Sequence, residues 1–350
     1  MIHSYLEAII MDCLLRIGGE RTVYSVYHIL YGKKSSQTIQ DSRFFYIEKY
    51  FRTLPSLERG HFQQCIDKLN ENGFIHVLNE KGNYRIEEKG REIMRHYVEK
   101  NPFPSYMNGF AFHMVAMPFW RRLSFLFQVV SNGVHKNSSY YCIEHDEFIQ
   151  KWVKKIVFKY NDMQELANAL HQELQRILST RPDDAASIFV LKLTGFHRAG
   201  YNNRQIGNRF GVDEYYVHFM FLDTLHLILQ HSTEEHTVLT EISEDLFKNR
   251  QSPITQSSLS TLSFLKKGYS ISEIAVVRQL KESTIEDHIV ELALHTSEVQ
   301  LTRFVDESLA DEIRLIAEES QTKQLKNIKG RLSKEATYFQ IRLVLAERRG

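Results

Sequence analysis

Side chains able to do acid, base or metal chemistry are thinly spread along this chain of 350 residues. Its three cysteines lie far apart, without the paired spacing of a zinc site or a disulfide framework. His226, His231 and His236 follow one another at a spacing that does not put three ligands on one helix face. The adjacent residues His145-Asp146-Glu147 would point in different directions on a helix. We therefore expect no metal site.

Motifs of nucleotide and hydrolytic chemistry are also missing from the sequence. No G-x-x-x-x-G-K-[ST] loop occurs, and Gly32-Lys33-Lys34 lacks the spacing that would hold ATP phosphates. Neither an H-E-x-x-H metal motif nor a nucleophile elbow is present. We predict a protein without catalytic activity and without a cofactor.

One predicted helix, over residues 57–72, carries side chains suited to nucleic acid. Four apolar residues at helical spacing form its expected buried stripe: Phe62, Cys65, Ile66 and Leu69. The polar side chains left to face outward include Arg59, Gln63, Gln64 and Lys68. Arg, Lys and Gln bind phosphates and base edges, so this segment is interpreted as a recognition helix.

The formal net charge of +1 excludes wholesale electrostatic attraction to nucleic acid. Any such contact must come from local patches. The most basic patch is the tail, where residues 323–350 hold 8 Lys or Arg against 2 Asp or Glu. Within it, Lys326, Lys329 and Arg331 are candidates for phosphate binding.

Residues 1–100 predict a winged-helix unit. Helices are expected over 4–17, within 21–34 up to the break at Gly32, and over 44–51 and 57–72. Two alternating segments then flank a turn at 79–83, which predicts a β-hairpin. A hairpin directly after the core helices corresponds to the wing.

The two prolines at 102 and 104 mark a boundary, after which residues 103–180 are predicted to form a helical middle. It is expected to contain a strand-like segment at 140–143 and helices over 146–158 and 162–178. Trp and Arg are enriched in protein interfaces, so a partner-docking role is open to Trp120, Arg121 and Arg122. The basic helix face formed by Lys151, Lys154, Lys155 and Lys159 is interpreted as solvated.

The second half predicts two helix-turn-helix units, over 183–232 and 254–350. In the second unit, Ser270 precedes Glu273 and Ser283 precedes Glu286 at the spacing of a capping box, which indicates two helix starts. The first unit repeats the pattern 68 residues upstream, because Gly200-Tyr201 matches Gly268-Tyr269. Its third helix is too apolar to contact DNA. The outward face of the third helix in the second unit is expected to carry Glu282, Glu286, Asp287 and Glu291 against His288. These carboxylates would repel phosphates.

The C-terminal segment resembles the helix-turn-helix module that closes many bacterial RecQ-type helicases. The residues that carry this resemblance include Gly268, Ser270, Glu273, Ile274, Ala275, Arg278, Leu280 and the run Ile341 to Ala346. The first hundred residues resemble the winged-helix domain of the same helicases, in YHILYGKKSSQTIQ, FQQCIDKLNENGFI and NYRIEEKGREIM. In that family the recognition helix or the hairpin engages duplex DNA, which adds Lys81 and Arg85 to the candidates.

The whole chain is similar to the YpbB family of low-GC Gram-positive bacteria, found beside a short RecQ-type helicase. The resemblance implies a DNA-binding accessory protein that supplies the missing domains to that helicase in DNA repair, recombination or fork processing. Two alternatives stay open, a helix-turn-helix transcriptional regulator and an adaptor without DNA contact, and a homodimer is compatible with any of the three.

The sequence as a whole predicts a mainly α protein, with an N-terminal winged helix, a small β-hairpin wing, a helical middle and helix-turn-helix units in the C-terminal half. No apolar run reaches the length of a membrane span. The first residues lack the features of a signal peptide. We therefore expect a cytoplasmic protein at the nucleoid.

Overall fold

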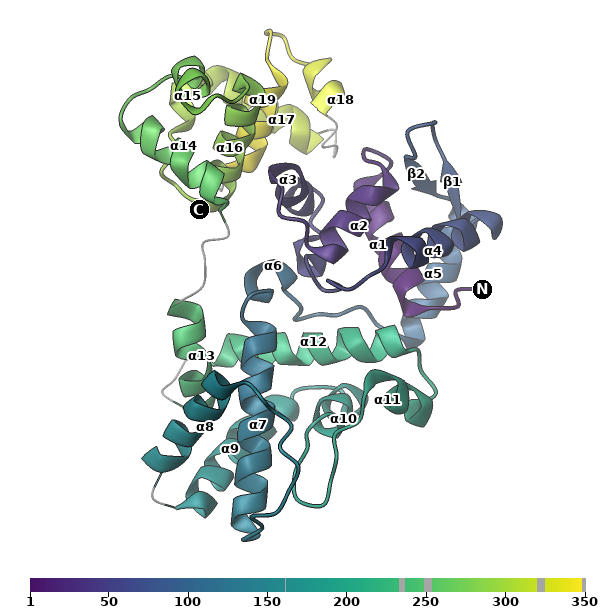
Figure 1. Ribbon diagram of the computed structural model, residues 1–350. Coiled ribbons are helices and arrows are strands. Elements are labelled where there is room, and N and C mark those ends of the chain that lie inside the picture. Colours follow the sequence, from purple (N-terminus) through teal and green to yellow (C-terminus); the bar gives the residue numbers. More distant parts are fainter. Residues whose placement is uncertain (161, 233–236, 249–253, 320–324, 348–350) are drawn as a thin grey trace.

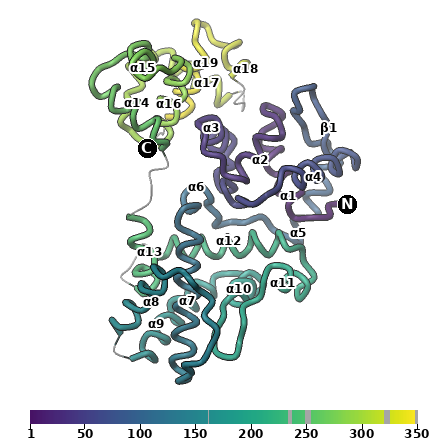
Figure 2. Tube along the Cα trace, viewed as in Figure 1, coloured from purple at the N-terminus to yellow at the C-terminus, as the bar shows by residue number. Residues whose placement is uncertain are grey.

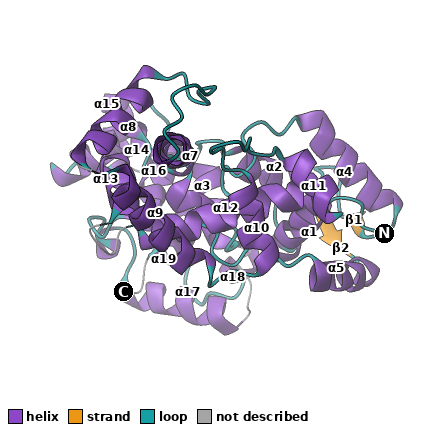
Figure 3. Ribbon diagram, turned by 90° about the horizontal axis from the view of Figure 1, so that it is seen from below, coloured by secondary structure: helices purple, strands orange, loops and turns teal. Residues whose placement is uncertain are grey.

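The computed structural model describes residues 1–160, 162–232, 237–248, 254–319 and 325–347, and these are mainly helical (Figure 1). Among these residues, strands form a single two-stranded hairpin, drawn in orange in Figure 3. The mainly α prediction is confirmed. Parts of the polar segment over 231–253 and both ends of the basic tail over 323–350 lie outside the described residues.

The winged helix forms as the sequence predicts in most of its elements. Ser4 caps α1 through its hydroxyl, and Gly18 ends that helix in the left-handed region at φ 60°, where glycine carries no steric cost. The hairpin pairs Ile75 with Ile86 and Val77 with Tyr84. Its elements are α1 (Tyr5–Ile17), α2 (Val23–Tyr31), α3 (Ser36–Phe44), α4 (Arg59–Glu71), β1 (Ile75–Val77), β2 (Tyr84–Ile86) and α5 (Glu88–Lys100).

The prediction of a helix over 44–51 is wrong. The chain instead forms α3, which ends at Phe44, and a short 3-10 turn at Glu48–Tyr50. The buried side chains of α3 include polar Gln40, Asp41 and Ser42, so the segment lacks the apolar periodicity that marks a helix. Burial of these polar groups depends on partners elsewhere in the fold. Arg21, for example, donates to Asp41 at 2.9 Å.

The middle of the chain packs around α12 (Glu214–His231), the long helix that crosses the centre of Figure 1. It contacts α1, α7, α9, α10, α11 and α13. The helices of this region are α6 (Gly109–Phe112), α7 (Ala116–Val134), α8 (Glu147–Lys159), α9 (Met163–Leu178), α10 (Asp183–Leu191), α11 (Asn203–Phe210) and α13 (Val238–Lys248). Residues 140–143 form a loop rather than a strand, because no neighbouring strand offers a hydrogen-bonding edge.

One continuous hydrophobic core runs from Ile2 to Ile242. The ranges 1–100, 103–180 and 183–232 therefore share a core. An ion pair buried at their junction joins Arg181 to Asp223 at 2.6 Å, and Asp223 also accepts from the backbone amide of Tyr106 at 2.6 Å. A buried carboxylate needs such partners to be stable in the folded state.

A second core, from Leu262 to Ala346, belongs to the C-terminal domain. Its helices are α14 (Gln256–Lys266), α15 (Ile271–Arg278), α16 (Glu282–His295), α17 (Glu307–Glu319), α18 (Leu325–Lys329) and α19 (Tyr338–Ala346). Along the trace in Figure 2, this green and yellow domain lies beside α3 of the winged helix, which it contacts through α16 and α19.

The internal repeat is visible in the local structure of the two helix-turn-helix units. Their middle helices, α11 and α15, both begin with a complete capping box, formed by Asn202 with Gln205 and by Ser270 with Glu273. Both end at a left-handed residue, at Gly211 and at Gln279. The second capping box expected in the C-terminal unit is wrong, because α16 starts at Glu282 and Lys281 caps it without a side-chain hydrogen bond.

Candidate nucleic-acid interface

The predicted recognition helix, α4, which directly precedes the hairpin, presents its predicted side chains on two flanks. Arg59 and Gln63 are one turn apart and face α2: the Arg59 guanidinium lies 4.2 Å from the centre of the Tyr24 ring, and the Tyr24 hydroxyl donates to Gln63 at 2.7 Å. Gln64 and Lys68 lie on the other flank and are exposed. Only the second pair is left without a partner from the fold, so it is the better placed to contact DNA.

The hairpin is fixed to the loop between α1 and α2. The backbone amide of Val23 donates to the carbonyl of Gly82 at 2.9 Å, and the Asn83 side chain donates to the carbonyl of Gly19 at 2.8 Å. Lys81, at the turn, and Arg85, on β2, both have exposed side chains. The wing thus holds two cations at the surface on a rigid support.

The basic tail reaches the base of this wing. A groove of about 430 Å³ lies between the α1–α2 loop and the tail, and its lining includes Gly19, Arg21 and Lys326. Lys329 places its amine 5.0 Å from the ring centre of Tyr338, and Arg331 is exposed in the turn that follows α18. The fold therefore brings Lys326 to the loop that anchors the wing, although the two are about three hundred positions apart in sequence.

The third helix of the C-terminal unit, α16, is covered. Glu291 is fully buried and accepts hydrogen bonds from Thr255 (amide 2.6 Å, hydroxyl 3.2 Å), Ser258 (2.8 Å) and Ser36 of α3 (2.8 Å). His288 is buried as well, bonded to Thr261 at 2.9 Å. The expectation that Glu291 and His288 face outward is wrong, because α14 and α3 cover this side of the helix.

Further contacts join α3 to the C-terminal domain. Phe44, at the end of α3, is buried in the second core rather than in the first. Gln40 donates to the carbonyl of Asp287 at 3.4 Å, and Arg342 of α19 pairs with the Asp287 carboxylate. Behind this contact His295 stacks on Phe110 at 5.1 Å. In a helix-turn-helix protein the third helix enters the major groove, but here the chain itself covers much of that helix.

The three residues considered for partner docking are engaged within the fold. Trp120 packs edge-on against Phe189 and Phe221 of the first hydrophobic core. Arg121 forms two hydrogen bonds with Glu144, at 2.7 and 2.8 Å. Arg122 donates to both carboxylate oxygens of Asp245, at 2.5 and 2.8 Å. These contacts give each side chain a structural role, and a docking role for them stays a prediction.

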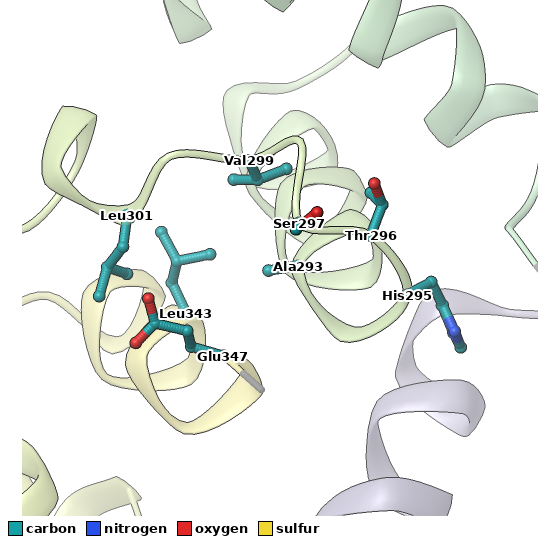
Figure 4. Close-up of a pocket in the computed structure, with 8 residues that line it drawn as sticks. All are labelled: Ala293, His295, Thr296, Ser297, Val299, Leu301, Leu343 and Glu347. Carbon is teal, nitrogen blue, oxygen red and sulfur yellow. The ribbon is translucent and has the colours of Figure 1, made fainter. Parts of the chain in front are cut away.

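Titratable side chains in two pockets of the described residues already have partners within the fold. Figure 4 shows one of about 510 Å³ between the end of α16 and α19. His295 points away from its centre in that view, and Glu347 pairs with Arg314 of α17. A second pocket of about 500 Å³ includes Lys192, whose pKa burial lowers to about 8, but its amine donates to Asn203.

Two histidines near the first hydrophobic core have lowered pKa values. Burial lowers the pKa of His226 to about 3, and its ring nitrogen accepts from the backbone amide of Asn108 at 2.9 Å. Burial also lowers the pKa of His113 to about 4. Within the described ranges, no group of three His, Cys, Asp or Glu side chains gathers as a metal site. No helix in those ranges combines the length and apolar character needed to cross a membrane.

Sequence reasoning missed two features of these surfaces. Tyr24 holds one flank of α4, and a lone tyrosine on a neighbouring helix gives no signal of that role. The Lys-rich face of α8 was noted, but the two aromatic side chains that share it, Phe148 and Phe158, were not. Their alternation with lysines along one predicted helix was the available signal.

Comparison with known proteins identifies a C-terminal domain and then the family of the whole chain. Residues 257–345 match the model of a helix-turn-helix domain family, which agrees with α14 to α19 and supports DNA binding. No solved structure gives a significant match. Protein YpbB of Bacillus subtilis (strain 168) is 33% identical over 348 residues, which cover 99% of this chain and 98% of that protein. Because this identity extends over nearly the full length of both proteins, the chain belongs to the YpbB family.

Proposed function

We propose that this protein is a non-catalytic DNA-binding accessory subunit of a short RecQ-type helicase, acting at forks in repair or recombination. It would supply the winged-helix and helix-turn-helix domains that such a helicase lacks. The observation that carries the proposal is the exposure of Gln64 and Lys68 on α4 and of Lys81 and Arg85 on the wing, together with Lys326 of the tail, which lines a groove beside the α1–α2 loop.

The chemistry of this surface favours DNA structure over DNA sequence. Its cations neutralise phosphates, which gives affinity without reading bases. The side chains of Arg59 and Gln63, which could read base edges, are already bonded to Tyr24. The covered α16 removes the second recognition helix that a regulator of this design would use. These points favour the accessory subunit over a sequence-specific regulator.

The first test measures binding of the full chain to a fork, to a plain duplex and to the short RecQ-type helicase of the same cell. We expect a stoichiometric complex in gel filtration and altered fork unwinding by the helicase. Binding to forks should fall steeply with salt, because phosphate contacts release counterions. Absence of association at micromolar concentration would refute the helicase assignment, and a footprint on a single operator would favour the regulator.

The residues are tested by the triple variant Lys68→Glu, Lys81→Glu and Arg85→Glu. We expect its fork affinity to fall by tenfold or more and its salt dependence to become shallower. A matched control is Arg204→Glu, which reverses one exposed charge on α11 and should leave fork affinity close to that of the wild type. Equal losses in both variants would show a nonspecific charge effect.

A further inference from the structure

The outer face of α8 joins aromatic rings to lysines in a way that the proposed function does not use. Phe148 and Phe158 are 83% and 74% exposed, which is unusual for large apolar side chains. The opposite face of the helix, formed by Ile149, Val153 and Ile156, is buried in the first hydrophobic core. The two rings therefore stay at the surface while the helix itself is firmly packed.

Four lysines surround these rings: Lys151, Lys154, Lys155 and Lys159. Lys154 lies 5.7 Å from the ring centre of Phe158. Lys151 pairs with Glu147 at 3.0 Å and Lys159 with Glu241 at 2.7 Å, but exposed pairs of this kind are weak. Lys154 and Lys155 form no ion pair with the described residues, so the face is positive overall.

We propose that this face binds single-stranded nucleic acid. Unpaired bases would stack on Phe148 and Phe158, and the lysines between them would neutralise the phosphates, which is how non-specific single-strand binding surfaces work. The rings are ten residues apart on one helix, so about 15 Å of axis separates them. A strand lying along α8 reaches both rings. A duplex does not offer its base faces, because they are stacked inside it.

The composition of the face favours this ligand over a protein partner. Lysine is depleted at the centres of protein interfaces, whereas here lysines stand between the two aromatic residues. A positive surface with accessible rings complements a polyanion that carries aromatic bases. The face also lies at the opposite end of the molecule from the β1–β2 hairpin, as Figures 1 and 3 both show. The proposal thus goes beyond the proposed function, since it requires neither the winged helix nor a helicase.

The test measures the affinity of the full chain for an oligo-dT of about 15 nucleotides by fluorescence anisotropy. An oligo-rU of the same length distinguishes DNA from RNA as the strand. In the double variant Phe148→Ala and Phe158→Ala we expect affinity to fall by tenfold or more, because stacking of one base contributes a factor of about 5 to 150. Both side chains are exposed, so the variant should keep the wild-type far-UV circular dichroism and unfolding transition.

Conservative variants separate stacking from general apolar contact. Tryptophan at both positions should keep the affinity, and leucine at both should lose it as alanine does. Phe210→Ala is the matched control, since that ring is also exposed at the end of a helix beside an arginine, and it should bind as the wild type does. Replacing Lys154 and Lys155 by Gln should make the salt dependence of binding shallower.

Three results would overturn the proposal. One is wild-type protein that does not bind the oligonucleotides, and another is binding that stays unchanged in the Phe148→Ala, Phe158→Ala variant. The third is a variant that keeps its oligonucleotide affinity but no longer associates with the helicase, which would assign the face to a protein partner. Failure of the proposed function is read separately, from fork binding by the Lys68, Lys81 and Arg85 variant.

Discussion

Helix α4 of the winged helix and helix α16 of the C-terminal unit both lie where a recognition helix is expected, but α4 is exposed and α16 is largely covered. On α4, Gln64 and Lys68 point to solvent beside a basic wing. On α16, Glu291 is fully buried beneath α3 and α14, and the exposed start of the helix carries Glu282. A helix-turn-helix plan therefore establishes the packing of three helices, while the surface that each unit presents depends on what the rest of the chain places against it.

The largest expected effect comes from Glu291→Ala. It leaves the buried hydroxyl of Ser258 and the half-buried donors of Thr255 and Ser36 without this acceptor, so the C-terminal domain should lose about 4 kcal/mol of unfolding free energy. Both tryptophans pack against the first hydrophobic core. Far-UV circular dichroism should therefore show an early urea transition that tryptophan fluorescence does not. Glu282→Ala, on the exposed start of α16, should leave both signals unchanged.

Phe44→Ala tests whether α3 covers α16. Phe44 belongs to α3 of the winged helix, but its ring is buried in the core of the C-terminal domain. Its removal should cost about 3 kcal/mol of unfolding free energy. Hydrogen exchange of the α16 amides should accelerate. Fork affinity should nonetheless stay unchanged, because the uncovered face carries Asp287 and Glu291, which repel phosphates. Tyr31→Ala, an exposed ring at the end of α2, serves as control. A gain in fork affinity on uncovering α16 would contradict our account.

Acid should destabilise the core that carries α4. His226 has a folded-state pKa of about 3, whereas an unfolded histidine titrates near 6.5. Below pH 6.5 the unfolded state binds the proton and the folded state does not, so stability that is present above this pH is lost as pH falls. The loss between about pH 6.5 and pH 5 is about 1.5 kcal/mol.

Urea unfolding followed by tryptophan fluorescence at several pH values checks this loss. His226→Gln should reduce the pH slope, and the remaining slope should come from other histidines whose pKa burial lowers, among them His113 and His218. His145→Gln, an exposed position in the loop before α8, should leave the slope as in the wild type. A slope unaffected by His226→Gln would show that another group is responsible.

The smallest expected effect compares single charges on the two helices. Lys68→Glu, on the exposed flank of α4, should lower fork affinity by about fivefold through loss of a phosphate contact. Lys281→Glu, at the start of α16, should change it by less than twofold, since α14 and α3 cover much of that helix. Anisotropy with one fork substrate measures both, and equal effects would remove the distinction between the helices.

Much of the local structure could be predicted from the sequence. The apolar stripe of α4, the hairpin about the turn at 79–83 and the start of α15 at Ser270 depend on neighbours within a few residues. The same holds for the exposure of Lys81 and Arg85 on the wing. Failures occurred where distant segments meet. α3 was missed because the partners of its buried polar residues, such as Asp287 for Gln40, lie far along the chain.

Local patterns in the sequence predict most of the segments that become helices, where most of these begin and end, and the cations of the wing and the tail. Which of these surfaces remain exposed depends on how distant elements pack against one another. Ser36 and Glu291 are 255 positions apart, and their hydrogen bond belongs to a contact that covers α16 and leaves α4 open. Caps and apolar periodicity act within one or two helical turns, whereas burial of a whole face depends on packing between elements that no local pattern specifies.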